Sequence, residues 1–354
     1  MKLHYKFIFL IFRLTGIFPH RRLRSIKDYK SVFCYIVTTI INIAIILIHV
    51  YLTILAVRNH KLYENPVANT ATNIIKLINR CSILLKWKKF VKICYLTNSF
   101  GIGAGKKYNI YICVWVIITL AFAIPLGILD VRVMSAAGVP YIHYGIPSEN
   151  TIMYNMAATM HTTYFYVFAK IPMDTFNLFY LIVCDHLRRV IKNFASSLDS
   201  KKKDYNSLLR NYVDIKSTIN FIDGELSLFV FLNVILTSAV MYDTVSGLMH
   251  TDLAKNPVRT FQIQLFFVYI LAYFLAVITA ASLVSEASQE VRQRAQALPL
   301  DEANVFRQQK FQSCAESEIF LTVWKIVPIR RSFALGTIGA IFTYALLFDN
   351  LIGK

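Results

Sequence analysis

The chain is dominated by apolar segments of about 20 residues, separated by gaps that are alternately rich and poor in basic residues. A helix of about 20 residues crosses the ~30 Å hydrocarbon core of a bilayer and satisfies its own backbone hydrogen bonds there. Six segments fit this description, namely 33–57, 109–129, 161–184, 226–248, 261–285 and 333–352. A seventh, 66–85, is more polar. The pattern predicts an all-α membrane protein with seven transmembrane helices.

The composition agrees with a membrane protein. Of the 354 residues, 56% are hydrophobic and only 16% are charged, which is too apolar for a soluble domain of this size. The formal net charge is +18, but the basic residues do not gather on one polar domain. A nucleic-acid partner is therefore not expected.

The basic residues predict the orientation of the chain. Of its 38 lysines and arginines, 29 fall in the gaps 1–32, 86–108, 185–225 and 286–332, and the other gaps hold six. By the positive-inside rule these four gaps are cytoplasmic, so the amino terminus is inside and the carboxyl terminus outside. The apolar run 7–12 is too short for a cleaved signal and predicts a helix on the cytosolic membrane surface, with Phe and Leu facing lipid.

Two long cytoplasmic gaps are expected to be helical. Apolar residues between 204 and 222 follow helical spacing, and Glu290 and Arg294 are placed to pair at i,i+4 in a polar helix after the sixth span. A further helix is expected from Asp301 through Trp324 until Pro328 breaks it.

Polar residues lie inside two of the predicted spans. In 66–85 they share one helical face, which predicts either a border with a polar cavity or another subunit, or a peripheral helix whose cations reach the headgroups: Asn69, Thr72, Asn73, Lys76, Asn79 and Arg80. In 161–184, Lys170 and Asp174 sit four residues apart on either side of Pro172, which favours a structural ion pair over a ligand or gating contact. Neither set resembles a catalytic or metal site, so we expect no enzyme activity and no cofactor.

Aromatic residues gather near the outer ends of several spans. They could line an outward-facing pocket for a small, mostly apolar molecule, although an interfacial aromatic belt has the same composition. The candidate ligand-binding residues are Phe122, Tyr154, His161, Tyr164, Tyr242, Phe266, Tyr269 and Tyr273.

The last span has its own pattern. Small residues at Ala334, Gly336, Gly339 and Ala340 would permit close helix packing. Near its end, Leu347 and Asn350 are three residues apart, so several copies around an axis would stack an apolar ring on a polar ring. Such stacking is typical of a pore gate. The alternative is that the polar residues only mark the end of the span, where the helix leaves the membrane for water.

At these residues the chain resembles the insect-type gustatory and odorant receptors. The final span of that family typically ends in Thr-Tyr, five mostly apolar residues, Gln and then Phe or Leu. Here Thr343 and Tyr344 match, Asn350 stands in place of Gln, and Leu351 fits the variant of the odorant receptor co-receptor. Asp349 departs from the apolar pattern.

The resemblance implies a ligand-gated, non-selective cation channel that works without a G protein. Four subunits surround a pore, with Leu347 at the hydrophobic gate and Asn350 beside it. The implied organisation is a cytoplasmic segment 1–32, transmembrane helices with a ligand-binding outer half in 33–285, cytoplasmic anchor helices in 286–332 and a pore-lining helix in 333–354. Four Asp349 carboxylates near the outer mouth would concentrate cations.

The expected role is that of a gustatory receptor in the plasma membrane of chemosensory neurons. Its partners would be a small-molecule tastant, membrane lipid and related subunits in a homo- or heterotetramer. An odorant receptor subunit is the alternative. A G-protein-coupled receptor fits less well, because it needs the opposite orientation and this chain lacks the Asp-Arg-Tyr and Asn-Pro-x-x-Tyr motifs.

Overall fold

The computed structural model describes residues 3–15, 39–40, 42–48, 50–51, 54, 66–100, 106–136, 151–199, 204–249, 257–299 and 305–352. Most of the first predicted span, 33–57, lies outside these ranges, although residues 42–48 within it are helical. The other six predicted spans lie in helices.

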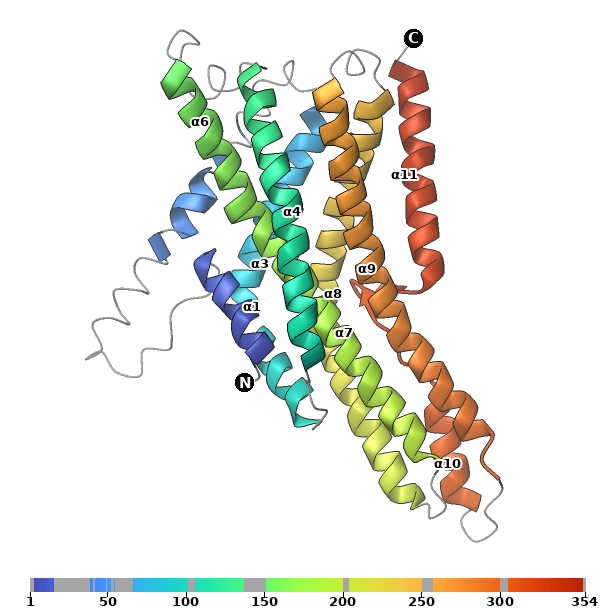
Figure 1. Ribbon diagram of the computed structural model, residues 1–354. Helices are drawn as coiled ribbons and strands as arrows, with labels where there is room; N and C mark the ends of the chain where they lie inside the picture. Colours follow the sequence, from blue (N-terminus) through green and yellow to red (C-terminus); the bar gives the residue numbers. More distant parts are fainter. Residues whose placement is uncertain are drawn as a thin grey trace, which may run out of the picture.

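The described chain is almost entirely helical (Figure 1). The helices are α1 Leu3–Leu14, α3 Pro66–Ser99, α4 Lys106–Ala136, α6 Thr151–Tyr164, α7 Ile171–Ser197, α8 Tyr205–Met249, α9 Pro257–Gln296, α10 Val305–Glu316 and α11 Arg331–Ile352. A π-helix, η2 Phe165–Lys170, joins α6 to α7 without a break. The two short strands β1 Thr322–Val323 and β2 Val327–Pro328 pair antiparallel.

Helices α8 and α9 are much longer than a bilayer is thick. Their 45 and 40 residues give lengths of about 68 and 60 Å, and both continue, with α7, beyond the lower end of α4 to meet α10 (Figure 1). Within the described residues, α8 and the Thr260–Gln296 part of α9 are the helices long and apolar enough to cross a membrane. Two shorter apolar helices are Ile110–Thr119 and Arg331–Leu347.

The lower part of the bundle is held by aromatic packing and ion pairs. Phe194 of α7, Tyr212 of α8 and Phe311 of α10 form a buried triangle with ring centroids 5.4 to 6.3 Å apart. The expected pair between Glu290 and Arg294 is present at 2.7 Å. The helical pattern predicted for 204–222 is confirmed, since that segment forms the first part of α8.

The prediction that the apolar face of α1 contacts lipid is wrong. Ile8 and Phe12 are fully buried in the protein core, and the ring of Tyr5 packs 6.2 Å from that of Phe179 in α7. The Tyr5 hydroxyl also shares a 2.9 Å hydrogen bond with the hydroxyl of Thr97 in α3. The apolar face of α1 is therefore covered by protein, mainly α7.

The prediction of a helix from Asp301 to Pro328 is also wrong for the second half of that segment. Helix α10 ends at Glu316, and Trp324 sits in a hairpin turn with a positive φ of 50°. Asp223 of α8 holds this hairpin, because its carboxylate accepts hydrogen bonds from the Thr322 backbone N–H and hydroxyl, each at 2.7 Å. Burial raises the pKa of Asp223, while those hydrogen bonds and the charge of Lys325 oppose the shift.

Candidate functional site

A cavity of about 260 Å³ lies between α3, α7, α8 and α9, and we call it the polar pocket. Its polar lining residues come from α3, η2, α7 and α8: Thr72, Lys76, Lys170, Asp174, Asn177, Asn233, Thr237 and Asp243. Phe266, Tyr269 and Tyr273 of α9 supply aromatic walls. Polar groups of both charge signs therefore meet aromatic rings in one small space, as in many ligand sites.

The local backbone around Lys170 departs from a regular α-helix. The π-helix η2 ends at Lys170, and Pro172 follows at the start of α7. Proline has no amide hydrogen for the helical ladder, and a π-helical turn changes which side chains share a face. Such interruptions are frequent at functional sites.

A charged cluster forms one side of the polar pocket. Lys170 Nζ lies 3.5 Å from Asp174 Oδ2, so the predicted ion pair is present. The Tyr269 hydroxyl donates a 2.7 Å hydrogen bond to the same carboxylate oxygen, and Lys170 Nζ lies 3.5 Å from the centroid of the Tyr269 ring. Because Asp174 is only 6% exposed, its charge depends on these two partners.

The other polar groups of the pocket come from separate helices. The side-chain amide nitrogen of Asn233 in α8 donates a hydrogen bond to the side-chain oxygen Oδ1 of Asn177 in α7. Across the pocket, Lys76 of α3 and Asp243 of α8 are close enough to interact electrostatically. The pocket therefore contains two lysine–aspartate combinations, one between η2 and α7 and one between α3 and α8.

The structure brings together seven of the residues singled out from the sequence and leaves others elsewhere. Those in the polar pocket are Thr72, Lys76, Lys170, Asp174, Phe266, Tyr269 and Tyr273. Tyr154 is buried on α6, and Tyr242 lines an open groove between α8 and α11. The backbone of Phe122, His161 and Tyr164 is helical, but their side chains lie outside the described residues.

Arg80 belongs neither to the pocket nor to a membrane surface. It is 4% exposed, and its Nη2 donates hydrogen bonds to the Thr15 carbonyl oxygen at 2.8 Å and to Asn42 Oδ1 at 2.9 Å. For Arg80, both interpretations drawn from the sequence are therefore wrong, since it ties α3 to the chain that follows α1. Lys76 and Thr72, in contrast, do border a cavity.

Four polar lining residues were missed by sequence reasoning, Thr237 among them. Asn177, Asn233 and Asp243 all lie within predicted spans, so an intramembrane acid at Asp243 was a signal that could have been read. The two asparagines gave no comparable signal, because each is a single neutral polar residue in an apolar run. Among the described residues, no group of His, Cys, Asp and Glu side chains could hold a metal ion.

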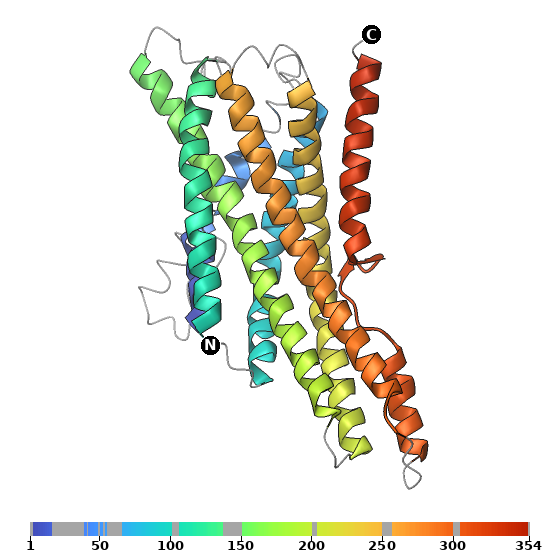
Figure 2. The same ribbon diagram turned by 45° about the vertical axis from the view of Figure 1, so that its right-hand side comes forward.

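Helix α11 stands at the side of the bundle next to α8 and α9 (Figure 2). Tyr344 and Leu347 are 57% and 52% exposed, and the Thr343 hydroxyl donates to the Gly339 carbonyl oxygen at 2.8 Å. Asp349 and Asn350 are in the helix, but their side chains lie outside the described residues. Within the described residues Gly336 and Gly339 make no close packing contact, since a Cβ built on either would meet nothing within 4 Å.

The fold resembles that of the insect olfactory receptor OR5 from Machilis hrabei. The TM-score is 0.69, with 15% sequence identity over 97% of both chains. The structure of the same receptor in complex with eugenol gives a TM-score of 0.67 and 16% identity over 98% of this chain and 97% of that one. No protein-family model and no curated protein sequence matches the chain. At this identity the likeness establishes the fold, an all-α arrangement shared along nearly the whole of both chains.

Proposed function

We propose that this protein is a chemoreceptor of the gustatory type, a ligand-gated cation channel opened by a small molecule in the polar pocket. The observation that carries the proposal is the pocket itself, formed by four helices of a fold shared with an olfactory receptor that has been solved with eugenol. The terminal Thr343 and Tyr344 add independent support from the sequence.

The proposed topology has seven spans, a cytoplasmic amino terminus and an extracellular carboxyl terminus in the plasma membrane. The asymmetry of the basic residues supports this orientation. It places the polar pocket toward the outside, where a tastant arrives, and puts the lower ends of α7, α8 and α9 with α10 in the cytoplasm. There they would form the anchor at which subunits meet.

The proposed pore is lined by α11 from four subunits. Exposed Tyr344 and Leu347 on a helix at the side of the bundle support this role, because such apolar surface needs cover from lipid or another copy. Leu347 would form the gate, with Asn350 and Asp349 toward the outer mouth. The hairpin that Asp223 fixes to α8 would link the anchor to the pore helix.

An odorant receptor subunit is the second candidate. It is favoured by the olfactory receptor OR5, which shares the fold. The two candidates differ in ligand rather than in mechanism, so panels of tastants and odorants applied to cells that express this chain alone would separate them. A response that required a co-expressed related subunit would indicate a heterotetramer.

The test is whole-cell recording with G-protein signalling blocked. A ligand-evoked cation current that survives the block is expected, and loss of the response under the block would overturn the channel proposal. The variant Lys76→Met removes a charge from the polar pocket and should shift the half-maximal ligand concentration at least tenfold, which corresponds to about 1.4 kcal/mol. Its matched control is Lys88→Met, an exposed lysine of the same helix, which should leave the response unchanged.

The pore assignment has its own test. Neutralising Asp349 as Asp349→Asn should lower cation conductance, because the proposed ring of carboxylates raises the local cation concentration. Unchanged conductance and cation preference would remove Asp349 from the pore. A carboxyl-terminal tag should be accessible on intact cells, and accessibility only after permeabilisation would contradict the orientation.

A further inference from the structure

A second cavity opens between α4, α7 and α9, and we call it the apolar groove. Its volume is about 620 Å³. Its rim carries exposed apolar side chains, including Val114 of α4 at 47% and Val268 of α9 at 57% exposure. Apart from Asp185 and Arg188 at one end, its lining residues are aliphatic, aromatic or threonine. A surface of this kind is unfavourable in water and suits an apolar occupant.

The dimensions of the groove match one leaflet of a bilayer. Its lining on α9 extends from Val268 to Leu283, a rise of about 22 Å along the helix axis. Half of the ~30 Å hydrocarbon core is about 15 Å, which an extended acyl chain of one leaflet occupies. The groove is therefore long enough for such a chain.

The charged end of the groove is positive. Asp185 is paired with Arg189 at 2.8 Å, and the Arg189 guanidinium also lies 5.0 Å from the centroid of the Tyr108 ring. Arg188 is partly buried, lines the groove and has no ion-pair partner among the described residues. One guanidinium charge is thus left uncompensated where the apolar lining ends.

From these features we propose that the groove binds an acyl chain of an anionic phospholipid, with the lipid phosphate on Arg188. A guanidinium binds phosphate through paired N–H donors, and the uncompensated positive charge of Arg188 favours a headgroup with a net negative charge over a zwitterionic one. Arg188 lies in the basic gap 185–225, so the lipid belongs to the cytoplasmic leaflet. The inference depends on the proposed membrane embedding but not on channel activity.

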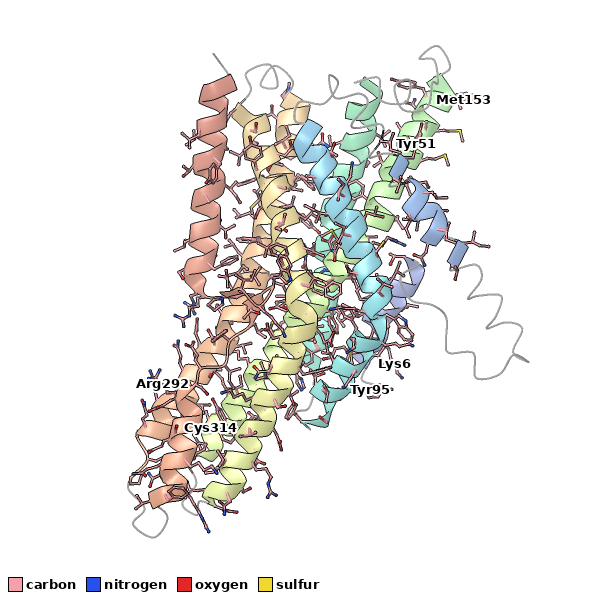
Figure 3. The ribbon with its side chains drawn as sticks, turned by 180° about the vertical axis from the view of Figure 1, so that it is seen from behind. Lys6, Tyr51, Tyr95, Met153, Arg292 and Cys314 are labelled. Carbon is pink, nitrogen blue, oxygen red and sulfur yellow. The ribbon has the colours of Figure 1, made fainter. Side chains whose placement is uncertain are left out.

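The test measures lipid retention by the purified full chain. The protein is reconstituted in vesicles of equal phosphatidylcholine and phosphatidylglycerol, extracted in detergent, and its bound lipid is quantified by mass spectrometry. Wild type should retain phosphatidylglycerol in preference to phosphatidylcholine. Arg188→Gln should lower phosphatidylglycerol retention about fivefold, as loss of ~1 kcal/mol predicts. The matched control is Arg292→Gln, an exposed arginine near the lower end of α9 (Figure 3), which should change nothing.

A second variant tests the groove rather than the charge. Ala276→Phe places a ring in the groove and should lower retention of both lipids equally, whereas Arg188→Gln should lower retention of phosphatidylglycerol more than that of phosphatidylcholine. Equal retention of both lipids by wild type, or wild-type retention by either variant, would overturn the proposal. Crosslinking of two chains through Ala276→Cys would also overturn it, because a second copy would then occupy the groove.

Unfolding curves in detergent should show that each variant is folded, because Ala276 is exposed and Arg188 is only partly buried. The lipid readout needs no ligand and no current. A chain that retains phosphatidylglycerol but never conducts would contradict the proposed function and leave this inference intact.

Discussion

The polar pocket and the apolar groove share the side chains of Tyr269 and Tyr273 as a common wall, yet they arrange their polar groups in opposite ways. In the pocket, the buried charges of Lys170 and Asp174 pair with each other, and Tyr269 donates a hydrogen bond to Asp174. In the groove, charge is confined to one end and the rest is open apolar surface. The difference follows from the cost of charge in hydrocarbon, which a protein tolerates where partners or a water-filled cavity surround it.

This difference predicts two kinds of binding. A ligand in the polar pocket must compete with hydrogen bonds that the pocket already makes, so its affinity depends on matching donors and acceptors. An occupant of the groove gains mainly from buried apolar area, with a single charge setting headgroup preference. Tyr269 and Tyr273 contribute to both kinds of binding, because each lines both cavities.

The largest effect is expected from Asp174→Ala. This change leaves the Lys170 ammonium and the Tyr269 hydroxyl without their common partner in a buried site, and should cost about 3–5 kcal/mol of folding stability. Thermal unfolding of the purified protein should show a clear fall in melting temperature. Asp174→Asn is the matched control, because an amide oxygen still accepts from Tyr269 and the loss should be smaller. Equal melting of Asp174→Ala and wild type would mean that the cluster does not organise the pocket.

A smaller effect is expected from Tyr269→Phe, which separates the two cavities experimentally. The ring stays in the common wall, but the 2.7 Å hydrogen bond to Asp174 is lost, at a cost of about 1.5–3 kcal/mol for a bond to a charged group. Ligand-evoked current should need a higher ligand concentration, while phosphatidylglycerol retention should stay at the wild-type level. A fall in lipid retention would show that the hydroxyl organises the groove as well.

The parts of this structure that were predictable from the sequence depend on spacing within one helix. The Lys170–Asp174 and Glu290–Arg294 pairs are both i,i+4 neighbours, so helical geometry alone places them together. The same reasoning identified the lower part of α8. For α1, helical spacing gave the apolar face correctly, but it carries no information on whether lipid or protein covers that face.

The parts that were missed depend on contacts between distant segments. Asn233 and its partner Asn177 are 56 residues apart, and Arg80 reaches a carbonyl 65 residues away. The hairpin after α10 is held by Asp223, which is 99 residues from Thr322. The helical pattern of the sequence continues through this hairpin, but hydrogen bonds to Asp223 stabilise the hairpin instead of a helix. Only the packing of whole helices decides such contacts, so local periodicity could not reveal them.

The smallest effect is expected from Tyr273→Phe, and it is the most direct test of how the common wall divides the two cavities. The Tyr273 hydroxyl shares a hydrogen bond of 3.4 Å with the Thr119 hydroxyl of α4, a long bond between neutral groups that is worth about 0.5 kcal/mol. Melting temperature and ligand sensitivity should therefore change little, in contrast to Tyr269→Phe. Both variants delete one hydroxyl from adjacent tyrosines whose ring centroids are 4.7 Å apart, so each controls for the other. An equal loss of ligand sensitivity in the two variants would mean that aromatic shape, rather than the hydrogen bond to Asp174, controls the pocket.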